Sequence, residues 1–324
     1  MKAAVIGTNW GRVHVGALRQ AGCEVTTLLA HDAELVARIA AEEAIPCHGT
    51  DPALLAGAEL VTIATPTDSH LGYLRDLTNP YVLCEKPLGL MPGNQAEFTA
   101  LPRAGRFISY PFPFLDGAQA IAQRVRAGKL GPLTRATLVV GVNLPYAKTP
   151  VEWFLEDVVH PFSLIFCLFE RFEWLGVRFA GGNNLTVQMR VDDALLDIML
   201  CDWPKPGLHF DLTLVGQQDS CQLRGGFRPS RGWWMEPLMV DDQPVTAGEP
   251  AEQQIWLRAN QRVVATLCAH LRGELTLEQA QTAGLYDLER AYQMESLFLP
   301  LWLAGAQQQA KSQVSDAPFS WTCS

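Results

Sequence analysis

Short apolar segments alternate with segments of helical period over the first 110 residues of the chain. The apolar segments are 3–6, 25–29, 60–64, 81–84 and 107–110, and the helical segments are 13–21, 33–44, 69–77 and 95–101. Strands that are apolar throughout and are separated by helices are typical of a parallel sheet with both faces covered. We therefore predict a doubly wound domain over residues 1–112.

The pattern changes after the proline-rich segment 110–113. Strands are expected at 135–142, 185–190, 195–201, 208–215 and 220–224, helices near 115–127 and 153–169, and two or three closing helices over 253–303. Runs of strands followed by runs of helices favour an α+β domain with a large, mostly antiparallel open sheet. This domain spans residues 113–324, and about the last dozen residues are predicted to be a loose tail. The chain as a whole belongs to the α/β class on this prediction.

The composition of the chain disfavours several kinds of partner. Lys+Arg 25 against Asp+Glu 34 gives a net charge of -9 and a pI near 5.3, which argues against nucleic acid and anionic membranes and favours a small-molecule substrate. The start of the chain lacks signal-peptide features, and no apolar run approaches the roughly 20 residues that span a bilayer. The cysteines are scattered without a CxxC pair. We therefore expect reduced thiols in a cytoplasmic protein, with neither a disulfide framework nor a metal site.

A glycine turn follows the first predicted strand and opens the first helix. It reads Gly7-Thr8-Asn9-Trp10-Gly11-Arg12. In this context such a turn places the pyrophosphate of a dinucleotide on a helix N-terminus, so its six residues are candidate cofactor ligands. The turn is not a full GxGxxG motif, because Asn9 replaces the second glycine and Gly11 comes one residue early. A plain tight turn is the alternative interpretation.

The end of the second predicted strand indicates which dinucleotide would bind. A carboxylate there normally binds the ribose hydroxyls of NAD, but this chain has Ala30 followed by His31. Because position 30 has no carboxylate, nothing there repels the 2′-phosphate of NADP. His31 could approach that phosphate, although the negative charge of Asp32 beside it would disfavour the phosphate. We expect NADP as the cofactor, with NAD as the alternative.

Two more segments follow strands at the same edge of the predicted sheet. Thr65-Pro66-Thr67-Asp68-Ser69-His70 could cap a helix through Thr67 or Asp68, or could contact the ribose and diphosphate of the cofactor. Its candidate cofactor contacts are Thr65, Pro66, Thr67 and His70. Glu85-Lys86-Pro87 ends the next strand, where open α/β sheets bind ligands. Lys86 is therefore a candidate catalytic residue, and Glu85 and Lys86 are candidate cofactor contacts.

A helical segment near residue 156 supplies an acid and an imidazole. Glu156 and His160 are four residues apart and share a helix face, so Glu156 could orient the imidazole for catalysis. Trp153 and Asp157, together with Lys86 and His160, are candidate substrate contacts. A satisfied core histidine is the alternative, and it is favoured unless Lys86 lies nearby.

The chain resembles the Gfo/Idh/MocA oxidoreductases in the order of four features. These are the glycine turn with His14, the turn that begins at Thr65, the Glu-Lys-Pro segment and the acidic pair before His160. The turn Gly128-Lys129-Leu130-Gly131 adds to a resemblance that covers essentially the whole chain. It implies a Rossmann domain that binds NAD or NADP and a second domain with an open sheet.

The resemblance also assigns residues to the site. It implies that Lys86 and His160 lie in the active site and that Glu156, with Asp157 adjacent, stands where the family has an aspartate. It implies a cis peptide bond before Pro87. The expected activity is hydride transfer between the nicotinamide and a hydroxyl or carbonyl carbon of a sugar, a polyol or a related metabolite. His160 would exchange the proton, Lys86 would hold the oxygen, and Glu156 would fix the imidazole tautomer.

One departure from the family pattern bears on the substrate. Family members often carry Asn-Arg-Arg-Phe after the sixth strand, where this chain has Pro111-Phe112-Pro113-Phe114. Two potential anion-binding cations are absent, which weakens the case for a phosphorylated or acidic substrate. A more apolar pocket is expected, to which Trp153, Trp233 and Trp234 could contribute unless they are core residues.

Two other functions remain open at this point. One is the NADPH-dependent reduction of an imine in a specialised metabolic pathway, and the other is a non-catalytic dinucleotide sensor. The open sheet face of such a domain commonly pairs with another copy, so we expect a homo-oligomer, either a dimer or a tetramer.

Overall fold

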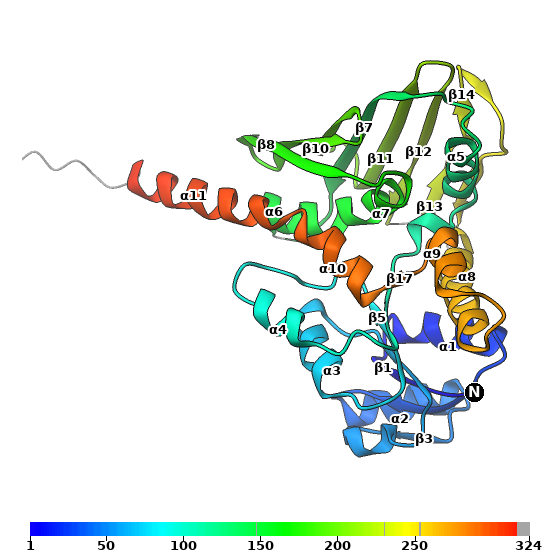
Figure 1. Ribbon diagram of the computed structural model, residues 1–324. Coiled ribbons are helices and arrows are strands. Elements are labelled where there is room, and N and C mark those ends of the chain that lie inside the picture. Colours follow the sequence, from blue (N-terminus) through cyan, green and yellow to red (C-terminus); the bar gives the residue numbers. More distant parts are fainter. Residues whose placement is uncertain (147, 230, 253, 316–324) are drawn as a thin grey trace, which may run out of the picture.

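The computed structural model of the protein describes residues 1–146, 148–229, 231–252 and 254–315. Within these ranges the chain forms two sheets, one in each half of the molecule, with helices packed around and between them (Figure 1). The long C-terminal helix α11 (Leu299–Ser315) extends away from both sheets.

The first sheet has the strand order β17-β6-β5-β4-β1-β2-β3. Its strands are β1 (Lys2–Ile6), β2 (Glu24–Leu29), β3 (Cys47–Gly49), β4 (Leu60–Ile63), β5 (Tyr81–Glu85), β6 (Arg106–Ser109) and β17 (Tyr286–Asp287). Strands β1 to β6 are parallel, and helices α1 (Gly11–Gln20), α2 (Ala33–Glu42), α3 (His70–Asp76) and α4 (Gln95–Ala100) connect them. The prediction of a doubly wound N-terminal domain is confirmed.

The second sheet has the order β15-β14-β12-β11-β7-β10-β9-β8, and β13 and β16 extend it beside β12. Its strands are β7 (Leu133–Asn143), β8 (Phe172–Gly181), β9 (Asn184–Val191), β10 (Ala194–Asp202), β11 (Gly207–Gly216), β12 (Ser220–Arg228), β13 (Gly232–Met235), β14 (Met239–Val240), β15 (Gln243–Pro244) and β16 (Glu249–Glu252). The pair β10 and β7 is parallel, and the other pairs are antiparallel. The predicted mostly antiparallel sheet is therefore confirmed. Helix α5 (Asp116–Arg126) packs against β12.

The helix predicted over 153–169 is interrupted by a wide turn. It consists of α6 (Pro150–Trp153), a π-helical turn η4 (Phe154–Val158) and α7 (Val159–Leu168), and it lies between the two sheets (Figure 1). A capping box between Thr149 and Glu152 begins it, with Pro150 in the first turn. A π turn inserts one residue into the helix, so side-chain spacings across it do not follow the 3.6-residue period.

The C-terminal segment returns to the first sheet. Helix α8 (Gln254–Leu271) packs against α1, and after α9 (Leu277–Ala283) strand β17 pairs with β6. Helix α10 (Leu288–Ser296) then leads to α11. Helix α11 ends at Ser315, beyond residue 303, where the closing helices were predicted to end. The rest of the predicted tail lies outside the described residues. The boundary between domains 1–112 and 113–324 remains a prediction.

Two further observations concern the described part of the chain as a whole. None of its helices is long and apolar enough to cross a membrane. Its seven cysteines have free thiols, and a sulfur–sulfur distance of 3.5 Å separates Cys23 from Cys268.

Candidate active site

The glycine turn adopts a backbone that only glycine tolerates. Gly7 has a φ of +113°, and a Cβ atom there would lie 2.2 Å from the carbonyl oxygen of Ala64. The helix that follows has no side-chain cap and no acidic residue in its first turn, so its N-terminal amide groups are not satisfied by a capping side chain. This turn fits the pyrophosphate of a dinucleotide.

The side chain of Arg12 is engaged within the protein. Its guanidinium donates to Glu43 at 3.0 Å and to Glu42 at 2.9 Å, both at the C-terminal end of α2. These two carboxylates would compete with a cofactor for the cation, and the cofactor contact of Arg12 stays a prediction. Nearby, His31 is exposed just after β2, and the carboxylate of Asp32 caps α2.

The predicted turn after β4 holds the site together through its histidine. The ring nitrogens of buried His70 lie 2.9 Å from the carbonyl oxygen of Thr65 and 2.8 Å from that of Pro87. Both ring nitrogens of His70 are thus engaged with the backbone, and the cofactor contact of His70 stays a prediction. The expected capping by Thr67 or Asp68 is also absent, because neither helix there has a side-chain cap.

Strand β5 ends at the two polar residues of the Glu-Lys-Pro segment. The carboxylate of Glu85 lies 2.6 Å from Nε2 of His14, and both side chains are buried, so the pair ties α1 to the end of β5. The Lys86 ammonium donates to the carbonyl oxygen of Glu156 at 3.1 Å. The peptide bond between Lys86 and Pro87 is cis, as the resemblance implied.

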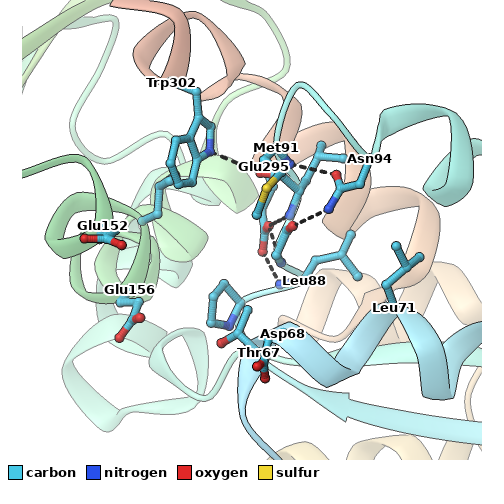
Figure 2. A pocket seen from close by; sticks show the side chains of 14 residues that line it. Thr67, Asp68, Leu71, Leu88, Met91, Asn94, Glu152, Glu156, Glu295 and Trp302 are labelled. Carbon is cyan, nitrogen blue, oxygen red and sulfur yellow. Dashed lines mark hydrogen bonds between the residues drawn. The ribbon is translucent and has the colours of Figure 1, made fainter. Parts of the chain in front are cut away.

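The loop after Lys86 is held by a carboxylate from the far end of the chain. Glu295 of α10 accepts hydrogen bonds from the amides of Leu88 (2.5 Å), Gly89 (3.1 Å) and Leu90 (3.3 Å) (Figure 2). It also accepts one from the hydroxyl of Tyr110 (2.5 Å). Burial raises the pKa of Glu295, although its four donors act in the opposite sense. The sequence analysis missed this residue because more than 200 residues separate it from the loop.

His160 is packed among tryptophans in the second domain. Its ring meets that of Trp256 edge-on at 4.9 Å, and Trp256 stacks on Trp233 at 4.4 Å. Burial and the nearby charge of Lys86 lower the pKa of His160 well below its usual value. Its Nδ1 atom is buried and has no hydrogen-bond partner among the described residues.

The two acids of this helical segment differ in their contacts. The Glu156 carboxylate contacts Lys148, and no hydrogen bond between Glu156 and His160 is present among the described residues. The π turn changes the spacing on which the predicted pair of Glu156 and His160 was based, so the orienting role of Glu156 stays a prediction without a contact to support it. Oδ2 of Asp157 is buried and unpartnered; burial raises the pKa of Asp157 to about 6, and Lys86 acts against this shift.

Several of these groups surround a cavity of about 390 Å³, which we call the central cavity. Its lining residues are Trp10, Ala64, Thr65, Glu85, Lys86, His160, Phe227, Trp233 and Trp256. It therefore brings together the glycine turn, the ends of β4 and β5, and the predicted histidine. Two tryptophans from the sequence analysis lie outside it: Trp153 is a buried residue near Tyr146, and Trp234 stacks on His209. The prediction that Trp153 contacts substrate is not supported by this placement.

Comparison with known families agrees with this arrangement. Residues 1–104 match the sequence model of the Gfo/Idh/MocA oxidoreductase family, which has an NAD-binding Rossmann fold. These residues therefore resemble the NAD-binding Rossmann domain of that family. None of the curated proteins matches this sequence.

Solved structures extend the likeness in fold to nearly the whole chain. A myo-inositol dehydrogenase from Corynebacterium glutamicum has a TM-score of 0.69 at 17% identity, covering 95% of this chain and 97% of that one. The WlbA dehydrogenase from Bordetella pertussis, solved with NADH and UDP-GlcNAcA, has a TM-score of 0.69 at 15% identity and covers 96% of both chains. A levoglucosan dehydrogenase solved with NADH has a TM-score of 0.72 at 11% identity, covering 95% and 97%.

The central cavity brings a cation and an imidazole together, and the carboxylate of Asp157 lies close by without lining it. Lys86 and His160 both line it, and Asp157 lies close enough for its pKa to respond to Lys86. A cation can stabilise negative charge on an oxygen, and a neutral imidazole can accept a proton. Trp256 was not anticipated, because a tryptophan on an amphipathic helix has no sequence signal that separates a cavity wall from a core position.

Proposed function

We propose that this protein transfers a hydride between a nicotinamide cofactor and a hydroxyl or carbonyl carbon of a small molecule of the sugar or polyol type. The observation that carries the proposal is that Lys86 and His160 line one cavity together with Trp10 of the glycine turn and Thr65. A reacting carbon in this cavity would lie beside the predicted nicotinamide position and within the field of a cation. The nicotinamide, when bound, supplies or accepts the hydride.

The protein's own groups would handle the oxygen and its proton. Lys86 holds the substrate oxygen and stabilises the negative charge that develops on it as the carbon–hydrogen bond breaks. His160 is neutral near pH 7, because its pKa lies well below 6.5, and its imidazole accepts the hydroxyl proton. The tryptophans around His160 exclude water from the imidazole.

Asp157 is the acid that we propose to act beside Lys86 in place of Glu156. The Lys86 cation favours the ionised form of its carboxylate, against the effect of burial. An ionised Asp157 offsets the positive charges of Lys86 and of a protonated His160, and so favours proton transfer to the imidazole. Its Oδ2 atom is buried and has no hydrogen-bond partner among the described residues.

The cofactor in this proposal is NADP, with NAD as the alternative. Two features at the end of β2 support NADP. The strand ends before Ala30, and the nearest carboxylate, that of Asp32, accepts from the amides of Glu34 and Leu35 at 3.0 and 2.9 Å. A carboxylate held in a helix cap is less available to bind ribose hydroxyls. His31 is exposed next to Ala30, where it could approach a 2′-phosphate.

The proposal also includes self-association through the open face of the second sheet. Helices α6 and α7 lie on the side of this sheet that faces the first domain (Figure 1). Exposed apolar side chains on its strands, among them Leu175, Leu195 and Val215, would be covered by a second copy. Sedimentation of the purified protein tests this part.

A substrate panel and a matched pair of variants test the activity. Sugars, polyols and cyclic imines are screened with NADP and NAD by the absorbance of the reduced cofactor. With the best substrate, Lys86→Met is expected to lower kcat about a thousandfold while leaving the Kd for the cofactor nearly unchanged. Lys129→Met, an exposed lysine in the second domain, serves as the control.

Each result of this experiment has a defined meaning. Unchanged turnover in Lys86→Met would refute the catalytic role of Lys86. Turnover of imines alone would favour the imine reductase, and cofactor binding without turnover of any substrate would favour the sensor.

A further inference from the structure

A second cavity of about 350 Å³ adjoins the central cavity, and we call it the side cavity (Figure 2). Its walls are the loop after Lys86, the start of α3, the helical segment that contains Glu156, and Trp302 of α11. Cavities of this size commonly accommodate small ligands. Thr67, Asp68, Pro87 and Glu156 of the sequence motifs line it, but the motifs did not predict a separate cavity.

Consecutive residues at the Lys86–Pro87 peptide bond line the two cavities. Lys86 lines the central cavity and Pro87 lines the side cavity. Glu156 lines the side cavity, and its carbonyl oxygen is 3.1 Å from the Lys86 ammonium. A molecule whose oxygen is held by Lys86 therefore needs only a short connection to extend into the side cavity.

The surface of the side cavity is mainly apolar. Leu71, Leu88, Met91, Leu155 and Trp302 contribute to it (Figure 2). The Trp302 indole is held in place by a hydrogen bond from its Nε1 atom to the carbonyl oxygen of Leu90, at 3.2 Å. A fixed indole and several aliphatic side chains favour an apolar group.

The polar groups of the side cavity are largely engaged within the protein. Glu295 accepts four hydrogen bonds, and Asn94 bonds to the amide of Met91 and the carbonyl of Gly89. Glu152 accepts from the amide and the hydroxyl of Thr149 in the helix cap. These groups consequently offer few free partners to a ligand.

The charge of the side cavity disfavours an anion. Asp68, Glu152 and Glu156 are acidic, and the lining residues in the described part of the chain include no lysine, arginine or histidine. The nearby cation of Lys148 is paired with Glu156. A phosphate or carboxylate on the substrate would be repelled here, in agreement with the missing arginine pair at Pro111–Phe114.

We propose that the side cavity holds the non-reacting part of the substrate, and that this part is an uncharged apolar group, aromatic or aliphatic, attached to the alcohol or carbonyl. The inference rests on the proposed function and narrows its substrate class. It distinguishes this protein from an enzyme for free polyols or for nucleotide sugars.

Binding of three probes to the full-length protein with NADP tests the proposal. Isothermal titration calorimetry gives the Kd of phenyl β-D-glucopyranoside, D-glucose and D-glucose 6-phosphate. We expect the phenyl glucoside to bind at least about tenfold more tightly than glucose, because its ring removes apolar surface from water, and the phosphate to bind most weakly.

Variants assign the preference to the side cavity. Trp302→Ala and Leu71→Asp are each expected to remove most of the advantage of the phenyl glucoside over glucose. Two variants on different elements are used because loss of the Trp302 hydrogen bond could disturb the loop after Lys86, whereas Leu71 lies on α3. Leu303→Ala, a 55% exposed neighbour on α11, is expected to keep the preference.

The outcomes separate this inference from the proposed function. Equal or undetectable affinities for the three probes, or a preference that both cavity variants retain, would overturn the inference even if Lys86-dependent turnover is found. A preference that requires Trp302 and Leu71 would support it even if no turnover is detected, in which case only the proposed function fails.

Discussion

The carboxylate of Glu295 lies 2.5 Å from the amide nitrogen of Leu88, although 207 positions separate the two residues in the sequence. Leu88 follows Lys86 by two residues, so a helix near the C-terminus fixes the loop that continues the candidate catalytic lysine. A buried carboxylate that accepts from three amides and one hydroxyl holds these four donors in fixed positions. Glu295 is thus a positioning residue for Lys86.

Replacing Glu295 tests this coupling. Glu295→Gln is expected to lower the free energy of unfolding by about 1–3 kcal/mol, because an amide accepts fewer of the four hydrogen bonds. It should also lower kcat about tenfold with little change in the Kd for NADP, since misplacing Lys86 weakens transition-state contacts. Urea denaturation and steady-state kinetics measure both, with Glu289→Gln, a 48% exposed residue on the same helix, as the control. A loss of stability without a loss of kcat would limit Glu295 to a structural role.

The raised pKa of Asp157 predicts how kcat/KM depends on pH. Burial raises its pKa to about 6, so the carboxylate is ionised at pH 7 and mostly protonated at pH 5. Because the ionised form offsets the charge of Lys86, kcat/KM should fall about tenfold between pH 7 and pH 5. His160 titrates at lower pH, since its pKa is lowered well below its usual value.

Variants of Asp157 and of its neighbour Glu156 show which of the two carboxylates causes the fall in kcat/KM. Asp157→Asn should remove the fall in kcat/KM near pH 6, because no carboxylate remains there to titrate. Glu156→Gln should retain it, since the Glu156 carboxylate contacts Lys148. A profile that loses its acidic limb in Glu156→Gln and keeps it in Asp157→Asn would restore the assignment based on spacing.

Replacing Gly7 of the glycine turn and Gly16 of α1 by alanine should change the stability of the fold in opposite directions. Gly7→Ala should destabilise the fold by about 3 kcal/mol or more and weaken cofactor binding, because its Cβ would lie 2.2 Å from the carbonyl oxygen of Ala64. Gly16→Ala, in the helix α1 with open space around its Cβ position, should stabilise the fold by about 0.5–1 kcal/mol. Thermal unfolding with and without NADP measures both effects. Similar melting temperatures for the two variants would contradict the close approach at Gly7.

The residue after β2 predicts the choice of cofactor. Ala30→Asp should shift the ratio of kcat/KM for NADP over NAD towards NAD by about tenfold or more, because a carboxylate repels the 2′-phosphate and binds ribose hydroxyls. Ala56→Asp adds the same charge to an exposed position near the start of β4, at the opposite edge of the sheet, and should leave the ratio unchanged. An equal response of both variants would indicate a general charge effect and remove the support for NADP.

Most of the first domain could be predicted because its signals are local. The strands β1, β2, β4, β5 and β6 are apolar runs with helices between them, and each predicted segment agrees with the structure to within a few residues. Strand β3 is three residues long, and β17 comes from residues 286–287, so neither has a local pattern. In the second domain, β8 and the short strands β13 to β16 were not among the predicted strands; β14 and β15 have only two residues each, which is too short for a sequence pattern.

The site was predicted in part, for the same physical reason. Lys86 follows from its place at the end of a parallel strand, and His160 from the resemblance, whereas Glu156, His70 and the side chain of Arg12 make other contacts than expected. Residue spacing predicts neighbours only on a regular helix, and the π turn at Phe154–Val158 breaks that regularity.

The sequence by itself determined the doubly wound domain, the glycine turn and the lysine at the end of β5, because hydrophobic period and backbone conformation are properties of neighbouring residues. The tertiary structure decided which acid lies near Lys86, which helix holds the loop beyond it, and that an apolar cavity adjoins the central one. Burial, charge and hydrogen bonding between residues that are distant in the sequence depend on how the whole chain packs, and no local pattern encodes that packing.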